Sequence, residues 1–291
     1  MLSQGSGAAK CLPRTSNDKG LRLARSRAKV QESTESCLSF RPDSRLVSDV
    51  APSPNRDERA DGRAPDMLLL HYTGMQSTLA AIARLRDENA PRVSSHYLVD
   101  EEGTVLQLVP EARRAWHAGA SHWAGESDIN SCSIGIEISN PGHEFGYADF
   151  PPHQIATVIA LCKDILGRHK IPTARVLAHS DVAPGRKQDP GEKFPWQELH
   201  KAGVGHWVAP APIAEGGALT EGNSGDEVRT LQQQLAAYGY GLDANGRFDA
   251  ATRDVIAAFQ RHFRPARVDG IADASTRKTL AALNAALPRQ S

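Results

Sequence analysis

Three short apolar runs, each holding or preceding an ionisable residue, constrain the fold of this 291-residue chain most strongly. They are MLLLHYTG from Met67, SIGIEISN from Ser133 and ARVLAHS from Ala174. A continuous apolar run bounded by turn-forming residues, as in the first of them, is typical of a strand in a sheet that is covered on both faces. The sequence therefore predicts buried strands that carry His71, Glu137 and His179.

Helical patterns and a hairpin alternate with these strands. Ser77 is a plausible N-cap for a helix through LAAIARLRDENA, in which Leu79, Ile82 and Leu85 are expected roughly on one face. A longer helix is expected from His153, where apolar residues recur at helical spacing. The stretch SHYLVDEEGTVLQLVP is typical of two strands joined by a tight turn. This alternation predicts an α/β domain over residues 46–208, with a mixed central β-sheet flanked by helices.

The last quarter of the chain predicts a second, smaller unit. A Pro-, Gly- and Ala-rich segment, residues 209–225, is expected to be a linker. Beyond it, NGRFDAATR from Asn245 is echoed by DGIADASTR from Asp269, so that a turn leads twice into a helix. Apolar residues at helical spacing predict a small three-helix domain over residues 226–287.

Composition argues against several other classes of protein. Lys plus Arg and Asp plus Glu number 34 each, which removes the simplest argument for nucleic-acid binding, because such domains are usually basic. No apolar run approaches the roughly 18 residues that a transmembrane helix needs. Cys11, Cys37, Cys132 and Cys162 lack metal-type spacing and are too few for a disulfide scaffold, so free thiols are expected.

The first 45 residues are polar and basic and show no apolar core of the kind that a secretory signal contains. We expect a disordered tail, because such low hydrophobicity cannot support a packed core. A start codon assigned too far upstream explains these residues equally well.

A set of ionisable residues needs an explanation beyond turn chemistry. His71 ends one strand, Glu137 lies within another, and His179, Lys187 and Asp189 fall in a single turn-rich loop. An isolated histidine at a strand end is more often structural than a ligand. Glu137 is either an ordinary residue on a solvent-facing side of its strand or a buried carboxylate that needs a partner, a metal or a raised pKa.

Two histidines and one carboxylate form a recognised ligand set for catalytic zinc. Such a site also uses a carboxylate to move protons and a cation to stabilise a developing oxyanion, and Glu137 and Lys187 are of the right types. No HExxH motif is present, so the helix-borne site of many zinc peptidases is not expected. Spacing alone does not show that these residues meet in space.

The order of five motifs supplies what spacing does not. LLLHYTG, SHYLVDEEGTVLQLV, AWHAG, NSCSIGIEISN and VLAHSDVAPGRKQDPG together resemble the zinc N-acetylmuramoyl-L-alanine amidase family, whose fold is shared with peptidoglycan recognition proteins. The resemblance spans roughly residues 46–207. The C-terminal unit resembles a three-helix peptidoglycan-binding domain with a doubled DG-x-x-D-x-x-T pattern, in which Asn245 replaces the first aspartate.

The resemblance implies a role for each residue of the set. His71, His179 and Asp189 would bind Zn²⁺, Glu137 would act as proton shuttle, and Lys187 would stabilise the oxyanion. The implied reaction is hydrolysis of the amide between N-acetylmuramic acid and the L-alanine of the stem peptide, in cell-wall turnover or recycling. Peptidoglycan or muropeptide fragments would be the binding partners.

Four further residues are candidates for substrate contacts. Trp116 and His117, in AWHAG, are expected to line the cleft or else to pack as structural residues. Asn130 is either a turn residue or a contact, and Arg186 either meets a stem-peptide carboxylate or is solvated. The histidines outside the motifs are expected to be structural; they are His122, His143, His153, His169, His200, His206 and His262.

Two alternatives remain open at the level of sequence. A non-catalytic peptidoglycan recognition module would show a lost metal ligand, whereas every ligand position is filled here. A hydrolase of the same fold that cuts another muropeptide bond is compatible with the same residues, because the surrounding cleft selects the bond. The C-terminal domain favours a cell-envelope location, and the absence of a visible signal peptide favours the cytoplasm.

Overall fold

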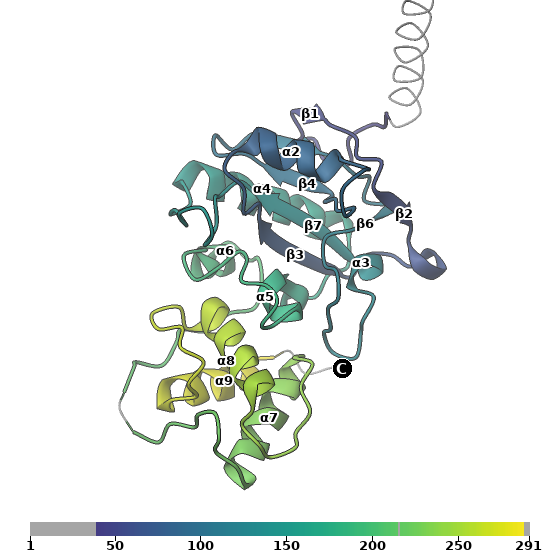
Figure 1. The fold of residues 1–291 in the computed structure, drawn as a ribbon. Coiled ribbons are helices and arrows are strands. Elements are labelled where there is room, and N and C mark those ends of the chain that lie inside the picture. Colours follow the sequence, from purple (N-terminus) through teal and green to yellow (C-terminus); the bar gives the residue numbers. More distant parts are fainter. Residues whose placement is uncertain (1–38, 215, 288–291) are drawn as a thin grey trace, which may run out of the picture. The chain divides into compact units, whose positions relative to one another are not determined.

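The computed structural model describes residues 39–214 and 216–287 (Figure 1). Its centre is a six-stranded sheet with the strand order β1-β5-β4-β7-β3-β8. The pairs β4–β7, β7–β3 and β3–β8 are parallel, β5 is antiparallel to β4, and β1 is parallel to β5. The predicted α/β class with a mixed central sheet is therefore confirmed.

The bounds of the elements follow the expected alternation of strands and helices. The strands of the sheet are β1 (Asp49–Val50), β3 (Met67–Tyr72), β4 (Tyr97–Val99), β5 (Val105–Gln107), β7 (Ser133–Ile138) and β8 (Val176–Ala178). A separate antiparallel pair consists of β2 (Arg56–Glu58) and β6 (Arg113–Ala115). The helices are η1 (Ala60–Gly62), α2 (Thr78–Arg86), α3 (Ile129–Cys132), α4 (Pro152–Arg168), η2 (Thr173–Arg175), α5 (His179–Val182), α6 (Trp196–Lys201), α7 (Asp226–Tyr238), α8 (Ala250–Phe263) and α9 (Ala274–Ala285).

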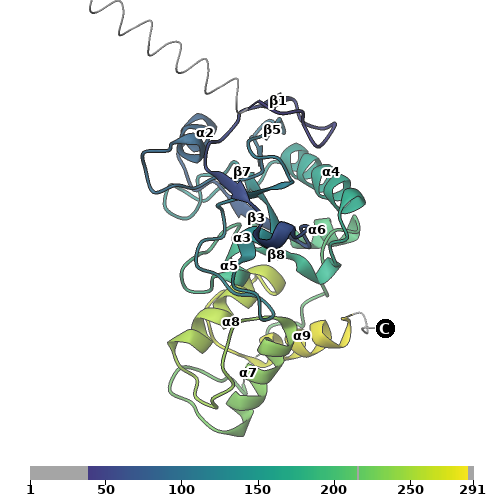
Figure 2. The same ribbon diagram turned by 90° about the vertical axis from the view of Figure 1, so that its right-hand side faces the viewer.

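Helices cover both faces of the sheet, as the continuous apolar strands predict (Figure 2). On one face, Leu68 and Leu70 of β3 pack with Ile134 and Ile136 of β7 in the same cluster as α4. On the other face, Leu98 of β4 packs with α2. Because side chains alternate along a strand, the residues next to these leucines and isoleucines lie on the face opposite α4. His71 and Glu137 are among them.

The helix predicted after Ser77 forms, with one correction to its apolar face. The Ser77 hydroxyl accepts a hydrogen bond from the Ala80 amide at 3.2 Å, which is the expected N-cap. Leu85 is buried, but Leu79 is 79% exposed. Six positions separate these leucines, which places them about 120° apart around a helix, so both cannot face the sheet.

The repeated motif of the C-terminal region produces the same local structure twice. Asp249 and Asp273 each accept a hydrogen bond from the amide of a threonine three residues later, at 2.9 and 2.7 Å, and so begin α8 and α9. In each copy, a buried glutamine of the preceding helix accepts a hydrogen bond from the turn glycine at 2.8 Å. These glutamines are Gln232 and Gln260.

The departure of Asn245 from the motif changes little in the structure. Its side-chain oxygen accepts a hydrogen bond from the Arg247 amide at 2.8 Å. Asp269 accepts one from the Ile271 amide at 3.0 Å in the second copy. The two residue types therefore stabilise the turn in the same way.

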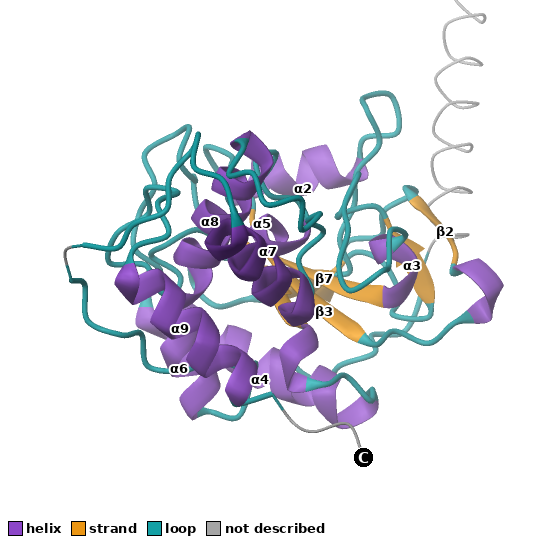
Figure 3. Ribbon diagram, turned by 90° about the horizontal axis from the view of Figure 1, so that it is seen from below, coloured by secondary structure: helices purple, strands orange, loops and turns teal. Residues whose placement is uncertain are grey.

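The C-terminal helices and the sheet domain share one apolar core. A single cluster of buried side chains contains Leu69 of β3, Val182 of α5 and Phe259 of α8. Figures 1 and 3 show α8 next to α5. The segment predicted as a linker is also held, since Ala211 hydrogen-bonds to Thr279 and Ser275, and Leu219 pairs with Ala272.

Most of the predicted 45-residue tail, with Cys11 and Cys37, lies outside the described residues. Its last residues are described, and they are ordered by contacts rather than disordered. The Asp43 amide donates to Gln107 at 2.9 Å, and the Asp43 carboxylate accepts from the Glu111 amide at 2.8 Å. The folded domain therefore begins before residue 46. Cys132 and Cys162 are buried free thiols.

Among the described residues, no helix is both long enough and apolar enough to cross a membrane.

Glu111 is a buried carboxylate that we expect to make folding stability depend on pH. Burial would raise its pKa, but hydrogen bonds from His169, Arg168 and Tyr97 outweigh that effect and lower the pKa to about 2. A folded-state pKa below the unfolded value stabilises the protein at pH values above about 4.5, and this stabilisation is lost as the pH falls toward 2. The shift corresponds to about 3 kcal/mol.

The measurement is urea unfolding of the wild type and Glu111→Gln between pH 7 and pH 3. We expect the wild type to lose stability in this range and the variant, which is less stable at pH 7, to show a flatter profile. Glu102→Gln, at an exposed position, serves as the control. Equal pH dependence in wild type and Glu111→Gln would contradict the assignment.

Candidate metal centre and active site

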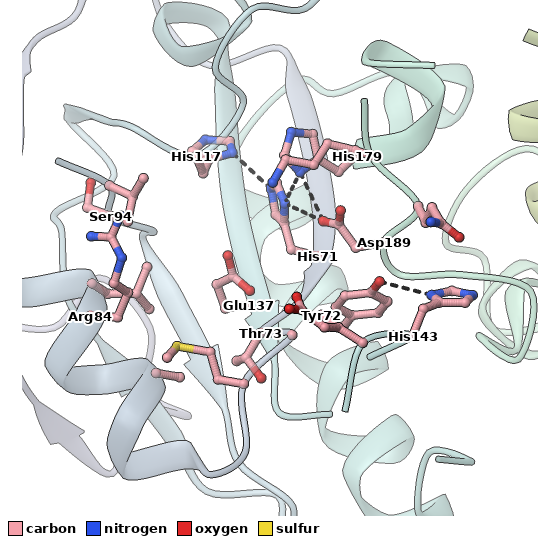
Figure 4. A pocket seen from close by; sticks show the side chains of 18 of the residues that line it. His71, Tyr72, Thr73, Arg84, Ser94, His117, Glu137, His143, His179 and Asp189 are labelled. Carbon is pink, nitrogen blue, oxygen red and sulfur yellow. Dashed lines mark hydrogen bonds and ion pairs between the residues drawn. The ribbon is translucent and has the colours of Figure 1, made fainter. Parts of the chain in front are cut away.

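Three buried side chains aim one donor atom each at a common point (Figure 4). His71 Nδ1 lies 2.9 Å from His179 Nδ1 and 3.0 Å from Asp189 Oδ2, and His179 Nδ1 lies 2.9 Å from the same carboxylate oxygen. Donors of a tetrahedral zinc site, with bonds of about 2.0–2.1 Å, lie roughly 3.3 Å apart. The donor types and their spacing therefore fit a metal ion.

Strand order explains why residues distant in sequence meet here. β8 pairs with β3 on one side and β7 pairs with it on the other, both in parallel. The carboxyl ends of the three strands therefore lie at one edge of the sheet. His71 is near the end of β3, and His179 follows β8 directly. The loop after α5 then returns to place Asp189 against both histidines.

Burial and mutual contacts shift the pKa values of two of these candidate ligands, His71 and Asp189. Burial, with a smaller contribution from His179, lowers the pKa of His71 to about 4. Burial alone would raise the pKa of Asp189, but the neighbouring His179 and His71 hold it well below its usual range. A neutral imidazole and an ionised carboxylate are the forms that bind metals.

The ring nitrogens that point away from the common point also have partners. His71 Nε2 lies 3.0 Å from His117 Nδ1, and His117 Nε2 lies 3.2 Å from the hydroxyl of Ser133. His179 Nε2 donates to the Ala118 carbonyl at 3.0 Å. Such outer hydrogen bonds fix the tautomer and ring orientation of metal-binding histidines. His117 and Ala118 of the AWHAG segment therefore orient the rings of His71 and His179.

The tautomers follow from these partners. Burial, with the nearby His71, lowers the pKa of His117 well below its usual range, so its ring is neutral. The Ser133 hydroxyl donates to the Ile129 carbonyl at 2.6 Å, so it accepts from His117 Nε2. The neutral His117 ring then accepts at Nδ1, and the donor there is His71 Nε2. This direction leaves His71 Nδ1 unprotonated, as a metal ligand must be.

Glu137 is the register partner of His71 across the β3–β7 pair and faces the same space (Figure 4). Its Oε2 atom is buried and has no hydrogen-bond partner within the described part of the chain. Burial, reinforced by the charge of Asp189, raises the pKa of Glu137 well above its usual range. This placement excludes the interpretation of Glu137 as a residue on an ordinary solvent-facing side of its strand.

A cavity of about 530 Å³ opens over these groups. Lys187 lines it and is partly buried, and its charge lowers the pKa of Glu137, against the larger effect of burial. The residues that line the cavity include all five of the ionisable set; they are His71, Glu137, His179, Lys187 and Asp189, with Tyr72, Thr73, Gly74, Met75, Ala81, Arg84, Leu85, Val93, Ser94, Trp116, His117, His143, Glu144, Arg186 and Gln188.

The four substrate-contact candidates occupy different positions. Trp116 lines the cavity, and its indole N–H donates to Asp57 at 2.6 Å. His117 also lines it, but chiefly supports His71. The Arg186 guanidinium is engaged by the Ala118 and Ala120 carbonyls, which ties two loops together. Asn130 does not line the cavity; its carboxamide oxygen accepts from the His117 and Ala118 amides.

His143 belongs to the site although sequence analysis placed it among the structural histidines. It lines the cavity, and its Nδ1 lies 2.9 Å from the Tyr72 hydroxyl, with Nε2 3.1 Å from Glu192. Its position in the turn just after β7, at the carboxyl edge of the sheet, is the signal that could have identified it.

The edge of parallel strands thus presents two histidines and an aspartate that could hold a metal ion, with a glutamate beside them in the same cavity. Two family models match the chain. The model described as N-acetylmuramoyl-L-alanine amidase matches residues 61–192, and that of a putative peptidoglycan binding domain matches residues 224–280.

Individual relatives agree with these matches. The N-acetylmuramoyl-L-alanine amidase AmiD of Escherichia coli (strain K12) is 39% identical over 229 residues, covering 75% of this chain and 81% of the relative. The 1,6-anhydro-N-acetylmuramyl-L-alanine amidase AmpD of Enterobacter cloacae is 31% identical over 174 residues, covering 51% of this chain and 86% of the relative. The chain therefore belongs to the N-acetylmuramoyl-L-alanine amidase family.

Solved structures place the fold in the same family. A complex of E. coli AmiD with the substrate anhydro-N-acetylmuramic acid-L-Ala-D-gamma-Glu-L-Lys has a TM-score of 0.65 and 38% identity, covering 78% of this chain and 91% of that one. AmpDh3 from Pseudomonas aeruginosa, in complex with anhydromuramic pentapeptide, has a TM-score of 0.63 and 31% identity, covering 85% and 98%. The predicted family, the enzyme class and the C-terminal peptidoglycan-binding domain are confirmed.

Loss of the His117 ring is expected to weaken metal binding without unfolding the protein. The His117→Ala change removes the acceptor that orients His71, and loss of such a partner typically costs about 10–100-fold in metal affinity. The measurement is competition for Zn²⁺ with a chromophoric chelator, with circular dichroism as the check on folding. His153→Ala, at an exposed histidine of α4, is the control. Wild-type affinity in folded His117→Ala would refute this role.

Proposed function

We propose that this protein is a zinc-dependent hydrolase that cleaves the amide between the lactyl group of N-acetylmuramic acid and the L-alanine of the stem peptide. One observation supports it above all: the converging donors of His71, His179 and Asp189 share a cavity with the unpaired Oε2 of Glu137. The names of the relatives support the choice of bond.

His71, His179 and Asp189 would hold the zinc ion through Nδ1, Nδ1 and Oδ2. Zinc bound by such a set supplies Lewis-acid chemistry, since it lowers the pKa of water and polarises a carbonyl group. Three protein ligands are the usual number at a catalytic zinc site, which keeps a fourth position for water or substrate.

Glu137 is the group that moves the proton. Its buried Oε2 has no hydrogen-bond partner in the part of the chain that the structure describes, so it can take a proton from the attacking water. Its raised pKa favours holding that proton until the C–N bond breaks, when the alanine nitrogen receives it and leaves as an amine. The water oxygen becomes part of the lactyl carboxylate, which balances the reaction.

Lys187 is the cation placed to stabilise the negative oxygen that develops on the scissile carbonyl. It lines the cavity and acts electrostatically on both His71 and Glu137. A preorganised positive charge in a partly desolvated site stabilises the transition state more than it would in water.

The C-terminal domain supports a substrate attached to the polymer, or large fragments of it, and a location in the cell envelope. The non-catalytic recognition module that the sequence left open would lack a metal ligand or the proton-shuttling carboxylate. Every one of these groups is in place here.

The direct test is digestion of purified peptidoglycan sacculi by the zinc-loaded protein, with released material identified by mass spectrometry. We expect free stem peptides that begin with L-alanine, and none from a chelated sample. Glu137→Gln keeps the side-chain volume and should lower the rate about 10²–10⁴-fold, because proton transfer is lost. Binding to sacculi without release of peptides would instead establish a recognition module.

Lys187→Ala should reduce kcat by about 10²–10³-fold with zinc content unchanged, because the residue stabilises a charge that exists only in the transition state. Lys187→Arg should restore part of the rate by keeping the positive charge. Turnover of a soluble muropeptide and metal analysis of the same samples check both points. A Lys187→Ala variant whose KM alone rises would assign the residue to substrate binding.

A further inference from the structure

We propose that the C-terminal domain, besides binding peptidoglycan, positions the loop that carries His179, Lys187 and Asp189. Helix α8 and the segment before it contact this loop along its length, through a buried hydrogen-bonded cluster at Asp181 and through polar contacts beside Asp189. His262 and Tyr240 are therefore positioning residues for the site described above.

Asp181 is the centre of the buried cluster. It is 0% exposed, and a buried carboxylate requires hydrogen-bond donors. The Tyr240 hydroxyl donates to its Oδ1 at 2.8 Å, and His262 Nδ1 donates to its Oδ2 at 2.6 Å. Both donors come from the C-terminal region, and two of the contacts that Asp181 needs are therefore supplied by another part of the chain.

The remaining contact of Asp181 leads directly to the metal site. Its Oδ2 accepts from the Ala178 amide at 2.8 Å. Ala178 ends β8 and precedes the ligand His179. The cluster thus fixes the backbone at the point where the chain leaves the sheet and His179 is oriented.

The His262 ring is itself held on both sides. It stacks on Trp196 with ring centroids 3.7 Å apart and on Phe263 with the same separation. Trp196 begins α6, at the far end of the metal-binding loop. His262 therefore connects the start of this loop, through Asp181, with the residues that follow its end.

Two further residues of α8 contact the middle of the loop. The Arg261 guanidinium donates to the Gln188 side chain at 3.3 Å and lies 3.9 Å from the Glu192 carboxylate. Gln188 directly precedes the ligand Asp189 and lines the cavity. Asp254 fills the space beside Gly185, so that a β-carbon there would collide with its carboxylate.

A C-terminal domain that positions the loop and one that only anchors the enzyme to the wall differ in their measurable effects. A domain that only anchors the enzyme to the wall would affect cleavage of sacculi and leave cleavage of a soluble muropeptide unchanged. A domain that positions the loop must also affect zinc affinity and kcat on the soluble substrate. The kinetic part of this proposal rests on the proposed function, whereas the zinc-affinity part does not.

The experiment uses the full-length protein with His262→Ala, His262→Asn and Tyr240→Phe, and Gln233→Ala at an exposed position of α7 as the control. Zn²⁺ affinity is measured by chelator competition, kcat and KM on a soluble N-acetylmuramoyl-L-alanyl peptide, and binding by co-sedimentation with sacculi. We expect His262→Ala to weaken zinc binding about tenfold and to lower kcat, with KM and sacculus binding little changed.

Asparagine places a donor near the position of Nδ1, so His262→Asn should recover most of the affinity. If His262→Ala fails to fold, Tyr240→Phe, which removes only a hydroxyl, still tests the proposal and should weaken zinc binding by a smaller factor. Wild-type zinc affinity in folded His262→Ala, or in Tyr240→Phe if the former does not fold, overturns the proposal. A wild-type protein that binds zinc but cleaves neither the soluble peptide nor sacculi refutes the proposed function alone.

Discussion

The parallel pairing of β3 with β7 and β8 is the constraint on which the rest of the site depends. It brings the carboxyl ends of three strands to one edge, so that His71 and Glu137 become register partners and His179 follows on the other side. A shift of one residue in the β3–β7 register would turn Glu137 to the opposite face, toward α4. The apolar contacts of Leu68 and Leu70 with that helix prevent the shift, and thereby also fix the chemistry.

The cavity holds two carboxylates, Asp189 and Glu137, whose pKa values are shifted in opposite directions. Asp189 lies against two histidines, which keep its pKa low. Glu137 Oε2 has no hydrogen-bond partner among the described residues, and burial raises the pKa of this carboxyl. Different environments for two groups of the same type commonly separate a permanent charge from a group that exchanges protons. The packing around the two carboxylates therefore supports the proposed division between a metal ligand, Asp189, and a proton carrier, Glu137.

The sequence predicted those features that depend on local pattern. Continuous apolar runs identified the buried strands, whereas the proposed roles of His71 and His179 came from the resemblance of the ordered motifs to the amidase family. It could not predict the roles of Asn130 or His262, because each depends on a contact with a residue outside its own segment. Asn130 contacts the backbone of His117, and His262 contacts Asp181, 81 residues away.

The sequence also did not predict which side of helix α2 is exposed to solvent. Apolar spacing placed Leu79 with Leu85, but only Leu85 packs in the cluster with Leu98 of the sheet, and Leu79 is exposed. Likewise, a Pro- and Gly-rich composition indicated a linker, while Ala211 and Leu219 are held by contacts with the C-terminal helices. Composition indicates the conformational freedom of an isolated segment. It does not indicate which other part of the protein the segment packs against.

The glutamine and aspartate hydrogen bonds that occur twice in the C-terminal helices have a consequence for the order of folding. Its glutamine-to-turn hydrogen bonds join residues only 14 and 10 positions apart. The β3–β7 pair, in contrast, joins Met67 to Ser133, a separation of 66 residues. Contacts that close short loops form faster than those that close long ones. The helices of the C-terminal region can thus be structured before the sheet is complete, and they then offer a formed surface to the loop that carries His179 and Asp189.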